Sequence, residues 1–266
     1  EANQLEQNDT YLHRMIEKIP EPGVILNSLP LDSFGHPIEA FSLQLAELVT
    51  NTPVNSTDEI ITTLHHLHPD SFSLNMLYGK RFTDTQNYEH AQKVFHDLMI
   101  KFSNRWQPYK MSAFVYYHLG DFPRALELIN RAFQLSRQSR ESDSDILLLK
   151  TRIQISNQLY DEASQTLSLW KTLHFTGIKE QTFLMSELTG ELFQARKKYS
   201  EAIIEYQKVL IATPANLSIL RNIAFCFEQL KKYTLAIEYY QRVYEIEHNQ
   251  LISQKIDDLK KLSPHH

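Results

Sequence analysis

The sequence is poor in the residues on which most catalytic and metal-binding motifs depend. It contains one cysteine and six glycines among 266 residues. A single cysteine excludes an internal disulfide and a CxxC zinc site, and the scattered glycines exclude a GxGxxG or P-loop phosphate cradle. No GxSxG, HExxH or protein-kinase signature is present either. These absences favour a protein that is not an enzyme and that holds no cofactor or metal.

Long apolar runs and an excess of basic residues are also missing. The longest uninterrupted apolar runs, such as Ala113–Tyr117, have five residues, whereas a membrane-spanning helix needs about 20. The formal net charge is −5, and no block of lysine and arginine provides the basic face that is typical of nucleic-acid binding. With 42% hydrophobic and 22% charged residues, the composition is that of a soluble, folded protein.

The N-terminal residue bears on the compartment. The chain starts with Glu1 and not with methionine, which indicates processing or trimming. We therefore keep two alternatives: the cytoplasm, which we favour, and a secretory route in which a signal peptide has been removed.

What the sequence does contain is a repeat. A motif of one aromatic residue, two variable residues and alanine recurs five times, where about one or two matches are expected by chance. The alanines are spaced by 34, 38, 39 and 34 residues and are Ala91, Ala125, Ala163, Ala202 and Ala236. Apolar residues follow each alanine four and seven positions later, which is the periodicity of one helical face.

A small or medium-sized residue precedes each alanine by twelve positions. These residues are Gly79, Ala113, Thr151, Gly190 and Ala224. Short polar turns lie between the two sites, with helix-start signals such as Asn87 and Asp121. Each unit is therefore predicted to be two helices that cross closely where the two small residues meet.

This pattern resembles the tetratricopeptide repeat, whose unit of 34 residues has small residues at its eighth and twentieth positions and an aromatic at its seventeenth. The five alanines take the twentieth position of units that begin near residues 72, 106, 144, 183 and 217. The resemblance implies an all-α, right-handed superhelical solenoid of helix-turn-helix repeats. The family's tryptophan at the fourth position is absent from all five units, and only the fourth unit has the family's proline, Pro214.

A weaker pattern precedes the five units. Residues 38–71 hold a degenerate copy of the repeat, with Leu45, Ile61 and Leu67 among its apolar positions. Residues 1–37 are expected to form a short N-terminal helix and a proline-rich connector. A degenerate first unit is consistent with a stack of repeats, because one face of a terminal repeat meets water.

Two segments are expected to lie outside the regular pattern. Residues 249–266 are predicted to form a C-terminal cap helix and a tail. The residues of this helix that are expected to face inward are Leu251, Ile252, Ile256 and Leu259. Residues 136–145, between the second and third units, are expected to form an exposed loop or a frayed helix end.

In the tetratricopeptide family the first helix of each unit lines a concave groove, and the resemblance implies which residues face it. These residues are Lys80, Lys110, Phe114, Tyr117, His118, Arg152, Glu187, Glu191, Arg221 and Phe225. Phe114 and Tyr117 have two interpretations: neighbouring elements cover them, or they anchor a ligand. The charge is expected to change sign along the groove, from a row of Lys80, Lys110 and Arg152 to the two glutamates.

Other candidate sites have simpler interpretations. Cys226 lies in an apolar run and is expected to be a buried core thiol, with a reactive thiol as the alternative. His65 and His68 could share a metal on one helix face, but a helix C-terminus also favours histidine, and we favour this second interpretation. One branch of the family binds chaperones through a carboxylate clamp, a fixed set of side chains on successive first helices. The corresponding positions here begin with Met76 and Lys80 and do not hold the residues of the clamp, so the clamp is absent.

The leading functional hypothesis is a protein–protein interaction scaffold or adaptor. It would bind a peptide or protein segment in the groove, with acidic residues of the segment near an apolar anchor. The alternative is a structural or self-associating array that acts through its convex face or caps, and the oligomeric state is left open. A helical-repeat RNA reader is disfavoured because the unit length varies and the net charge is −5.

Overall fold

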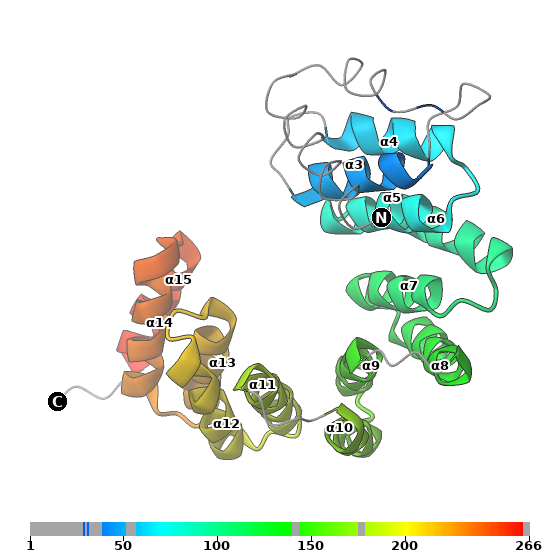
Figure 1. Cartoon of the computed structure of the whole chain (residues 1–266). Helices are drawn as coiled ribbons and strands as arrows, with labels where there is room; N and C mark the ends of the chain where they lie inside the picture. The colour runs from blue at the N-terminus through cyan, green and yellow to red at the C-terminus, as the bar shows by residue number, and fades with distance from the viewer. Residues whose placement is uncertain are drawn as a thin grey trace. The chain divides into compact units, whose positions relative to one another are not determined.

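The computed structural model describes residues 29, 31, 39–51, 57–139, 144–174 and 179–262, and within these ranges the regular elements are α-helices (Figure 1). The all-α class is therefore confirmed. The helices are α3 (Glu39–Asn51), α4 (Thr57–Leu67), α5 (Phe72–Asp84), α6 (Tyr88–Lys101), α7 (Gln107–His118), α8 (Phe122–Ser139), α9 (Ser144–Ser156), α10 (Tyr160–His174), α11 (Lys179–Ala195), α12 (Tyr199–Ala212), α13 (Leu217–Gln229), α14 (Tyr233–Glu247) and α15 (Gln250–Leu262).

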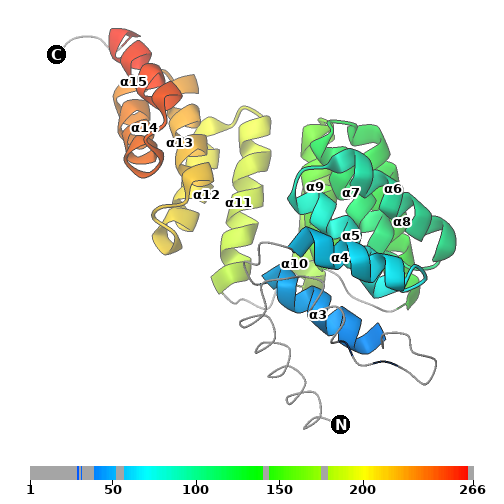
Figure 2. The ribbon, with the colours of Figure 1, turned by 90° about the horizontal axis from the view of Figure 1, so that it is seen from above.

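The chain divides into two compact units, Glu1–Glu141 and Ser142–His266. From here on, the first unit and the second unit are these two parts of the chain and not single repeats. In the first unit, α3 packs on α4, α5 on α6 and α7 on α8. In the second unit, α9 packs on α10, α11 on α12 and α13 on α14, and α15 covers α14. Figure 2 shows α13, α14 and α15 side by side from a second direction. Each unit is thus a stack of helical hairpins.

Polar residues start several of these helices. The side chain of Ser71 accepts a hydrogen bond from the backbone N–H of Leu74 at the start of α5. Asn87 does the same for α6, as its position predicts. Asp121 Oδ1 lies 3.2 Å from the backbone nitrogen of Arg124 in the first turn of α8. Such side-chain acceptors satisfy N–H groups that have no partner inside the helix.

The first helix of each hairpin from α5 to α13 ends in the same way. One residue adopts a positive φ, and the five residues concerned are Gln86, Gly120, Gln158, Lys197 and Lys231. Each of them donates its backbone N–H to the carbonyl three residues earlier, and the next residue donates to the carbonyl five residues before it. This is the Schellman motif, which turns the chain into the second helix within a few residues.

The two helices of a hairpin cross closely at the predicted small residues. The five motif alanines are fully buried. A Cβ built on Gly79 would lie 2.6 Å from Phe95 Cε1, and a Cβ built on Gly190 would lie 2.6 Å from Tyr206 Cε1. Because Cβ atoms do not tolerate such distances, glycine is required where these two rings pack on the opposite helix.

Two expectations for the flanks of the helices are wrong in part. The segment expected to be an exposed loop or a frayed helix end begins as the end of α8, which continues to Ser139; its first residue, Ser136, is buried and the next three are exposed. Residues 140–143 lie outside the described residues. In α15, Ile256 and Leu259 are buried as expected, whereas Leu251 is 74% exposed. Leu251 precedes Ile252 by one residue and so lies about 100° away from the stripe that Ile252 begins.

The degenerate N-terminal copy packs into a core that it shares with α5. Leu45, Ile61 and Leu64 are buried there together with Leu29 of the proline-rich connector and Leu74 of α5. Leu67 is exposed by 43%, contrary to the expectation, because it ends α4. The expected N-terminal helix and the rest of the connector, apart from the exposed Leu31, lie outside the described residues.

Candidate functional site

The predicted groove residues lie on the first helices of successive hairpins. Lys80 is on α5; Lys110, Phe114, Tyr117 and His118 are on α7; Arg152 is on α9; Glu187 and Glu191 are on α11; Arg221 and Phe225 are on α13. The residues on α5 and α7 belong to the first compact unit, and the residues on α9, α11 and α13 belong to the second. The site therefore consists of two parts, one in each unit.

In the first unit, aromatic side chains gather around His118. The ring centroid of His118 lies 4.3 Å from that of Phe114 and 5.3 Å from that of Tyr117. The ring of Tyr88, at the start of α6, stacks on His118 at 5.6 Å. Phe114 and Tyr117 are half-buried, and His118 is exposed. Phe114, Tyr117, His118 and Tyr88 are called the aromatic cluster below; its own members cover part of each ring and leave the rest accessible.

The aromatic cluster itself contains no lysine, arginine, aspartate or glutamate, and two lysines lie on first helices of the same unit. Burial lowers the pKa of His118 from its usual value, which favours the neutral imidazole at neutral pH. Lys110 Nζ lies 5.4 Å from the centroid of the Trp106 ring, a cation–π contact within the first turn of α7. Lys80 is exposed on α5. The first unit thus presents Lys110 on the same helix as three rings of the cluster, and Lys80 on the preceding first helix.

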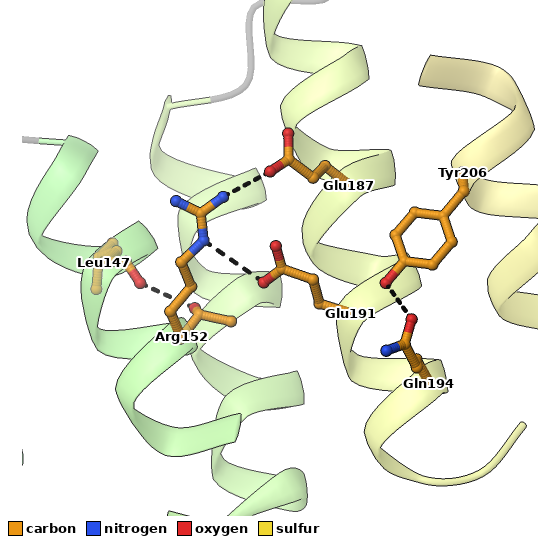
Figure 3. Close-up of polar contacts among 7 residues, drawn as sticks. Leu147, Arg152, Glu187, Glu191, Gln194 and Tyr206 are labelled. Carbon is orange, nitrogen blue, oxygen red and sulfur yellow. Dashed lines mark hydrogen bonds and ion pairs between the residues drawn. The ribbon is translucent and has the colours of Figure 1, made fainter. Parts of the chain in front are cut away.

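In the second unit, Arg152 has a different environment from the lysines. Its Nη2 lies 2.7 Å from Glu187 Oε1, and its Nε lies 3.5 Å from Glu191 Oε2. Figure 3 shows both carboxylates reaching from α11 toward the guanidinium on α9. Arg152 is therefore paired with the two glutamates toward which the charge of the groove is expected to change sign, and the sign change along the groove stays a prediction.

Arg152 does not stabilise the negative charges of Glu187 and Glu191 equally. Burial raises the pKa of Glu191 from its usual value, and the nearby charge of Glu187 raises it further, whereas Arg152 lowers it in part. The short contact of Arg152 goes to Glu187, and the contact with Glu191 is long. The charged form of Glu191 is thus only partly compensated within the chain.

Arg221 is also paired within the second unit. Its guanidinium forms an ion pair with the carboxylate of Glu247 at the end of α14. The arginines predicted to face a ligand from α9 and α13 therefore both have carboxylate partners. This pairing lowers the positive charge that these positions present to a partner.

A pocket of about 460 Å³ lies beside Glu191 in the second unit. Its lining includes Glu191, Gln194, Lys197, Tyr199, Asn222 and Phe225. Gln194 Oε1 accepts a hydrogen bond from the hydroxyl of the buried Tyr206 at 3.0 Å, also drawn in Figure 3. Sequence reasoning identified Glu191 and Phe225 but missed Gln194, although it lies one helical turn beyond Glu191 on the same face.

The remaining candidate residues have structural surroundings. Cys226 is buried, and burial raises the pKa of its thiol to about 12, so the thiolate needed for nucleophilic chemistry is scarce at neutral pH. The ring of His65 stacks on Tyr78 with a centroid distance of 4.2 Å. His68 Nε2 lies 2.9 Å from Ser42 Oγ. Both histidines thus have contacts on neighbouring helices.

Two kinds of feature are absent from the described part of the chain. No group of three histidine, cysteine, aspartate or glutamate side chains within the described ranges is arranged to hold a metal ion. Among the helices of those ranges, none combines the length and the apolar character needed to cross a bilayer.

Comparisons with known proteins identify the fold. No protein-family model matches the chain. A chain in the crystal structure of the APC/C hetero-tetramer Cut9-Hcn1 is similar with a TM-score of 0.72 and 14% identity, over 96% of this chain and 46% of that one. A tetratricopeptide repeat protein from Parabacteroides merdae is similar with a TM-score of 0.70 and 12% identity, over 97% of each chain. The predicted fold, a solenoid of tetratricopeptide-like repeats, is therefore confirmed.

A similarity in sequence was found as well. A BBSome complex member, the BBS4 homolog of Drosophila melanogaster, is 20% identical over 167 residues, which are 61% of this chain and 33% of the relative. The chain thus spans about a third of this curated relative and just under half of the Cut9-Hcn1 chain.

Proposed function

We propose that this chain, a solenoid of tetratricopeptide-like repeats, is a non-enzymatic scaffold that binds a segment of a partner protein along the first helices of its hairpins. The proteins to which it is similar include members of multi-protein assemblies, the Cut9-Hcn1 hetero-tetramer and the BBSome complex. A stack of hairpins offers a preformed surface, so that the loss of conformational entropy on binding falls mainly on the ligand.

The aromatic cluster of the first unit is the observation that carries this proposal. Phe114 and Tyr117 are held in place by ring contacts with His118, yet they are only half-buried. Rigid, partly exposed rings are the usual anchors of protein interfaces. Lys110 lies on α7 with Phe114 and Tyr117, and Lys80 lies on α5, the first helix of the preceding hairpin; both lysines would attract acidic residues that flank an apolar or aromatic anchor of the partner.

The test is a partner capture followed by a titration. The full chain serves as bait in the native source, with crosslinking mass spectrometry to identify the bound segment. Phe114→Ala is expected to weaken the affinity for that segment by about 1–3 kcal/mol, because a desolvated aromatic contact is lost. Lys80→Ala and Lys110→Ala are expected to change mainly the association rate and its dependence on salt.

Tyr116→Ala is a matched control, because Tyr116 lies on the same helix but packs under Arg124 outside the aromatic cluster. Circular dichroism checks that each variant remains folded. An affinity that is equal for Phe114→Ala and the unmodified chain would contradict the proposed binding surface.

Self-association is a second candidate function, and one observation favours it. Large aliphatic side chains are exposed near the ends of second helices, including Ile100 at 67% and Ile211 at 81%. Light scattering over a range of concentrations distinguishes the two functions. A dimer that forms without any captured partner would favour self-association, whereas a monomer would favour the scaffold.

A further inference from the structure

The pocket beside Glu191 combines features that the aromatic cluster lacks. It has a volume of about 460 Å³ and is lined by residues of α9, α11, α12 and α13 and of the turn after α11, all of them in the second unit. Its lining contains a carboxylate, Glu191, and three rings, of which Tyr206 is fully buried whereas Tyr199 and Phe225 are partly exposed. A concave site that combines aromatic walls with polar groups can fix both the position and the orientation of a ligand.

The charge of the pocket favours a cation. Two carboxylates of α11 share the single guanidinium of Arg152, and its short contact goes to Glu187. Glu191, which lines the pocket, contacts Arg152 at the longer distance of 3.5 Å. The raised pKa of Glu191 agrees with this geometry, because burial destabilises the charged carboxylate more than the attraction of Arg152 stabilises it. A second positive charge beside Glu191 would reduce that cost.

The aromatic walls favour a cation as well. The rings of Tyr199 and Phe225 meet edge to face, with centroids 6.2 Å apart and planes at 80°. Phe225 is 38% exposed, so part of its ring is accessible to a ligand. A guanidinium can stack on such a ring, and its alkyl stem can pack on it, whereas a carboxylate would be repelled by Glu191.

We propose that this pocket binds an arginine side chain of the partner segment, with the guanidinium against Glu191 and the stem against Tyr199 and Phe225. This proposal rests on the proposed function and adds the chemistry of one residue of the ligand. Arginine is favoured over lysine because its planar group is less strongly hydrated and can contact a carboxylate and a ring at once. Lys197 is the cation of the pocket lining, and its side chain is exposed on the turn at the rim.

The test uses two small probes that differ in charge but hardly in shape. N-acetyl-L-arginine amide and N-acetyl-L-citrulline amide are titrated into the full chain, in which phenylalanine and tyrosine carry isotope labels for NMR. The arginine probe is expected to shift the signals of Phe225 and Tyr199 with saturation. The neutral citrulline probe is expected to bind at least about five-fold more weakly, because it lacks the cation–π and ionic contributions.

Variants locate the effect within the pocket. Glu191→Gln is expected to weaken binding of the arginine probe by about five-fold and to leave binding of the citrulline probe unchanged. Lys197→Ala is expected to strengthen binding of the arginine probe about two-fold, because a repelling charge is removed from the rim. Glu162→Gln, an exposed carboxylate on α10, is the control and should change neither probe.

Failure of this inference can be distinguished from failure of the proposed function. Equal binding of the two probes, or arginine-dependent shifts that do not involve Tyr199 and Phe225, would overturn the inference while the partner capture is unaffected. This comparison uses the unmodified chain and so does not depend on the folding of a variant. If instead no partner is captured but the arginine probe binds and Glu191→Gln weakens it, the pocket assignment stands and the scaffold proposal fails.

Discussion

The first helices of the two compact units carry different charges at corresponding positions of the repeat. In the second unit, Arg152 on α9 faces Glu187 and Glu191 on α11, which lie 35 and 39 residues further along the chain. In the first unit, the corresponding positions hold Lys80 on α5 and, on α7, Lys110 and Phe114. A second cation and an aromatic ring thus replace the two carboxylates.

Under the two proposals, this difference gives the two units different ligands. The charge of Arg152 is largely cancelled by Glu187 and Glu191, and the pocket beside Glu191 is proposed to bind a cation. The first unit has no carboxylate at the corresponding positions, so its lysines and its aromatic cluster suit an acidic segment with an apolar anchor. One fold, repeated with the same helix packing, can therefore offer opposite electrostatic preferences to a partner.

The crossing points that both units share are expected to be the most sensitive to mutation. Gly190→Ala should lower the free energy of unfolding by about 2–3 kcal/mol and Gly79→Ala by about 1–2 kcal/mol, because the new Cβ meets a fully buried ring. The larger effect is expected at Gly190, where the Tyr206 ring is also held by its hydrogen bond to Gln194. An alanine in an exposed part of a helix would be stabilising instead.

Urea unfolding followed by circular dichroism measures both effects. The exposed helical site Gln241→Ala is the control and should stay within about 0.5 kcal/mol of the unmodified chain. Equal loss of stability at the two glycines would show that the hydrogen bond of Tyr206 does not restrict its ring.

Removing the cation at the corresponding positions tests the comparison directly. Arg152→Met is expected to destabilise the chain by about 1–2 kcal/mol at pH 7, because it leaves two partly buried carboxylates without their partner. Lys80→Met is expected to change stability by less than about 0.5 kcal/mol, because Lys80 is exposed. Urea midpoints of the two variants provide the measurement, and a similar loss for both would contradict the difference between the units.

The effect of Arg152→Met should depend on pH. Burial makes the pKa of Glu191 higher in the folded chain than in the unfolded chain, so the folded state binds its proton more tightly and loses stability as the pH rises through that pKa. Arg152 opposes this shift and Glu187 adds to it; Lys197 and Tyr206 are further ionisable residues that line the pocket beside Glu191. The penalty of Arg152→Met should therefore be larger at pH 7 than at pH 4, and Glu191→Gln in the same chain should reduce that dependence.

Much of the fold was predictable because its determinants repeat. The five buried alanines and the glycines at Gly79 and Gly190 follow from spacing alone, since helix crossing limits side-chain size wherever it recurs. The end of α8 and the exposure of Leu251 were not predictable in this way. They depend on single segments at which the repeat is interrupted, and so they have no second copy in the sequence for comparison.

The site was predictable in its placement but not in its pairing. The resemblance placed Arg152, Glu187 and Glu191 on first helices, yet their contact depends on the distance and rotation between α9 and α11, which a repeat of varying length does not determine. A signal was nevertheless present, because a spacing of 39 residues, equal to the local repeat length, puts Arg152 and Glu191 at the same repeat position. Gln194 was missed because it is uncharged, and Tyr199, the aromatic of the repeat motif that ends in Ala202, was expected to be a core residue, whereas it is partly exposed and lines the pocket.

The turns between the two helices of a hairpin allow the finest comparison of the units. Each turn needs one residue with a positive φ, which is glycine only at Gly120; in the second unit Gln158 takes this conformation with φ of 61°. A non-glycine residue pays about 1 kcal/mol there, part of which is recovered because glycine is more flexible in the unfolded chain. Gly120→Ala should therefore lower stability by roughly 0.5 kcal/mol, and Gln158→Gly should raise it by about the same amount. Thermal unfolding of both variants and of the double variant measures these effects, which should add because the two turns belong to different units. A stabilising Gly120→Ala would mean that the turn between α7 and α8 can form without a left-handed residue. The Schellman hydrogen bonds of this turn would then not be what directs α8 back along α7.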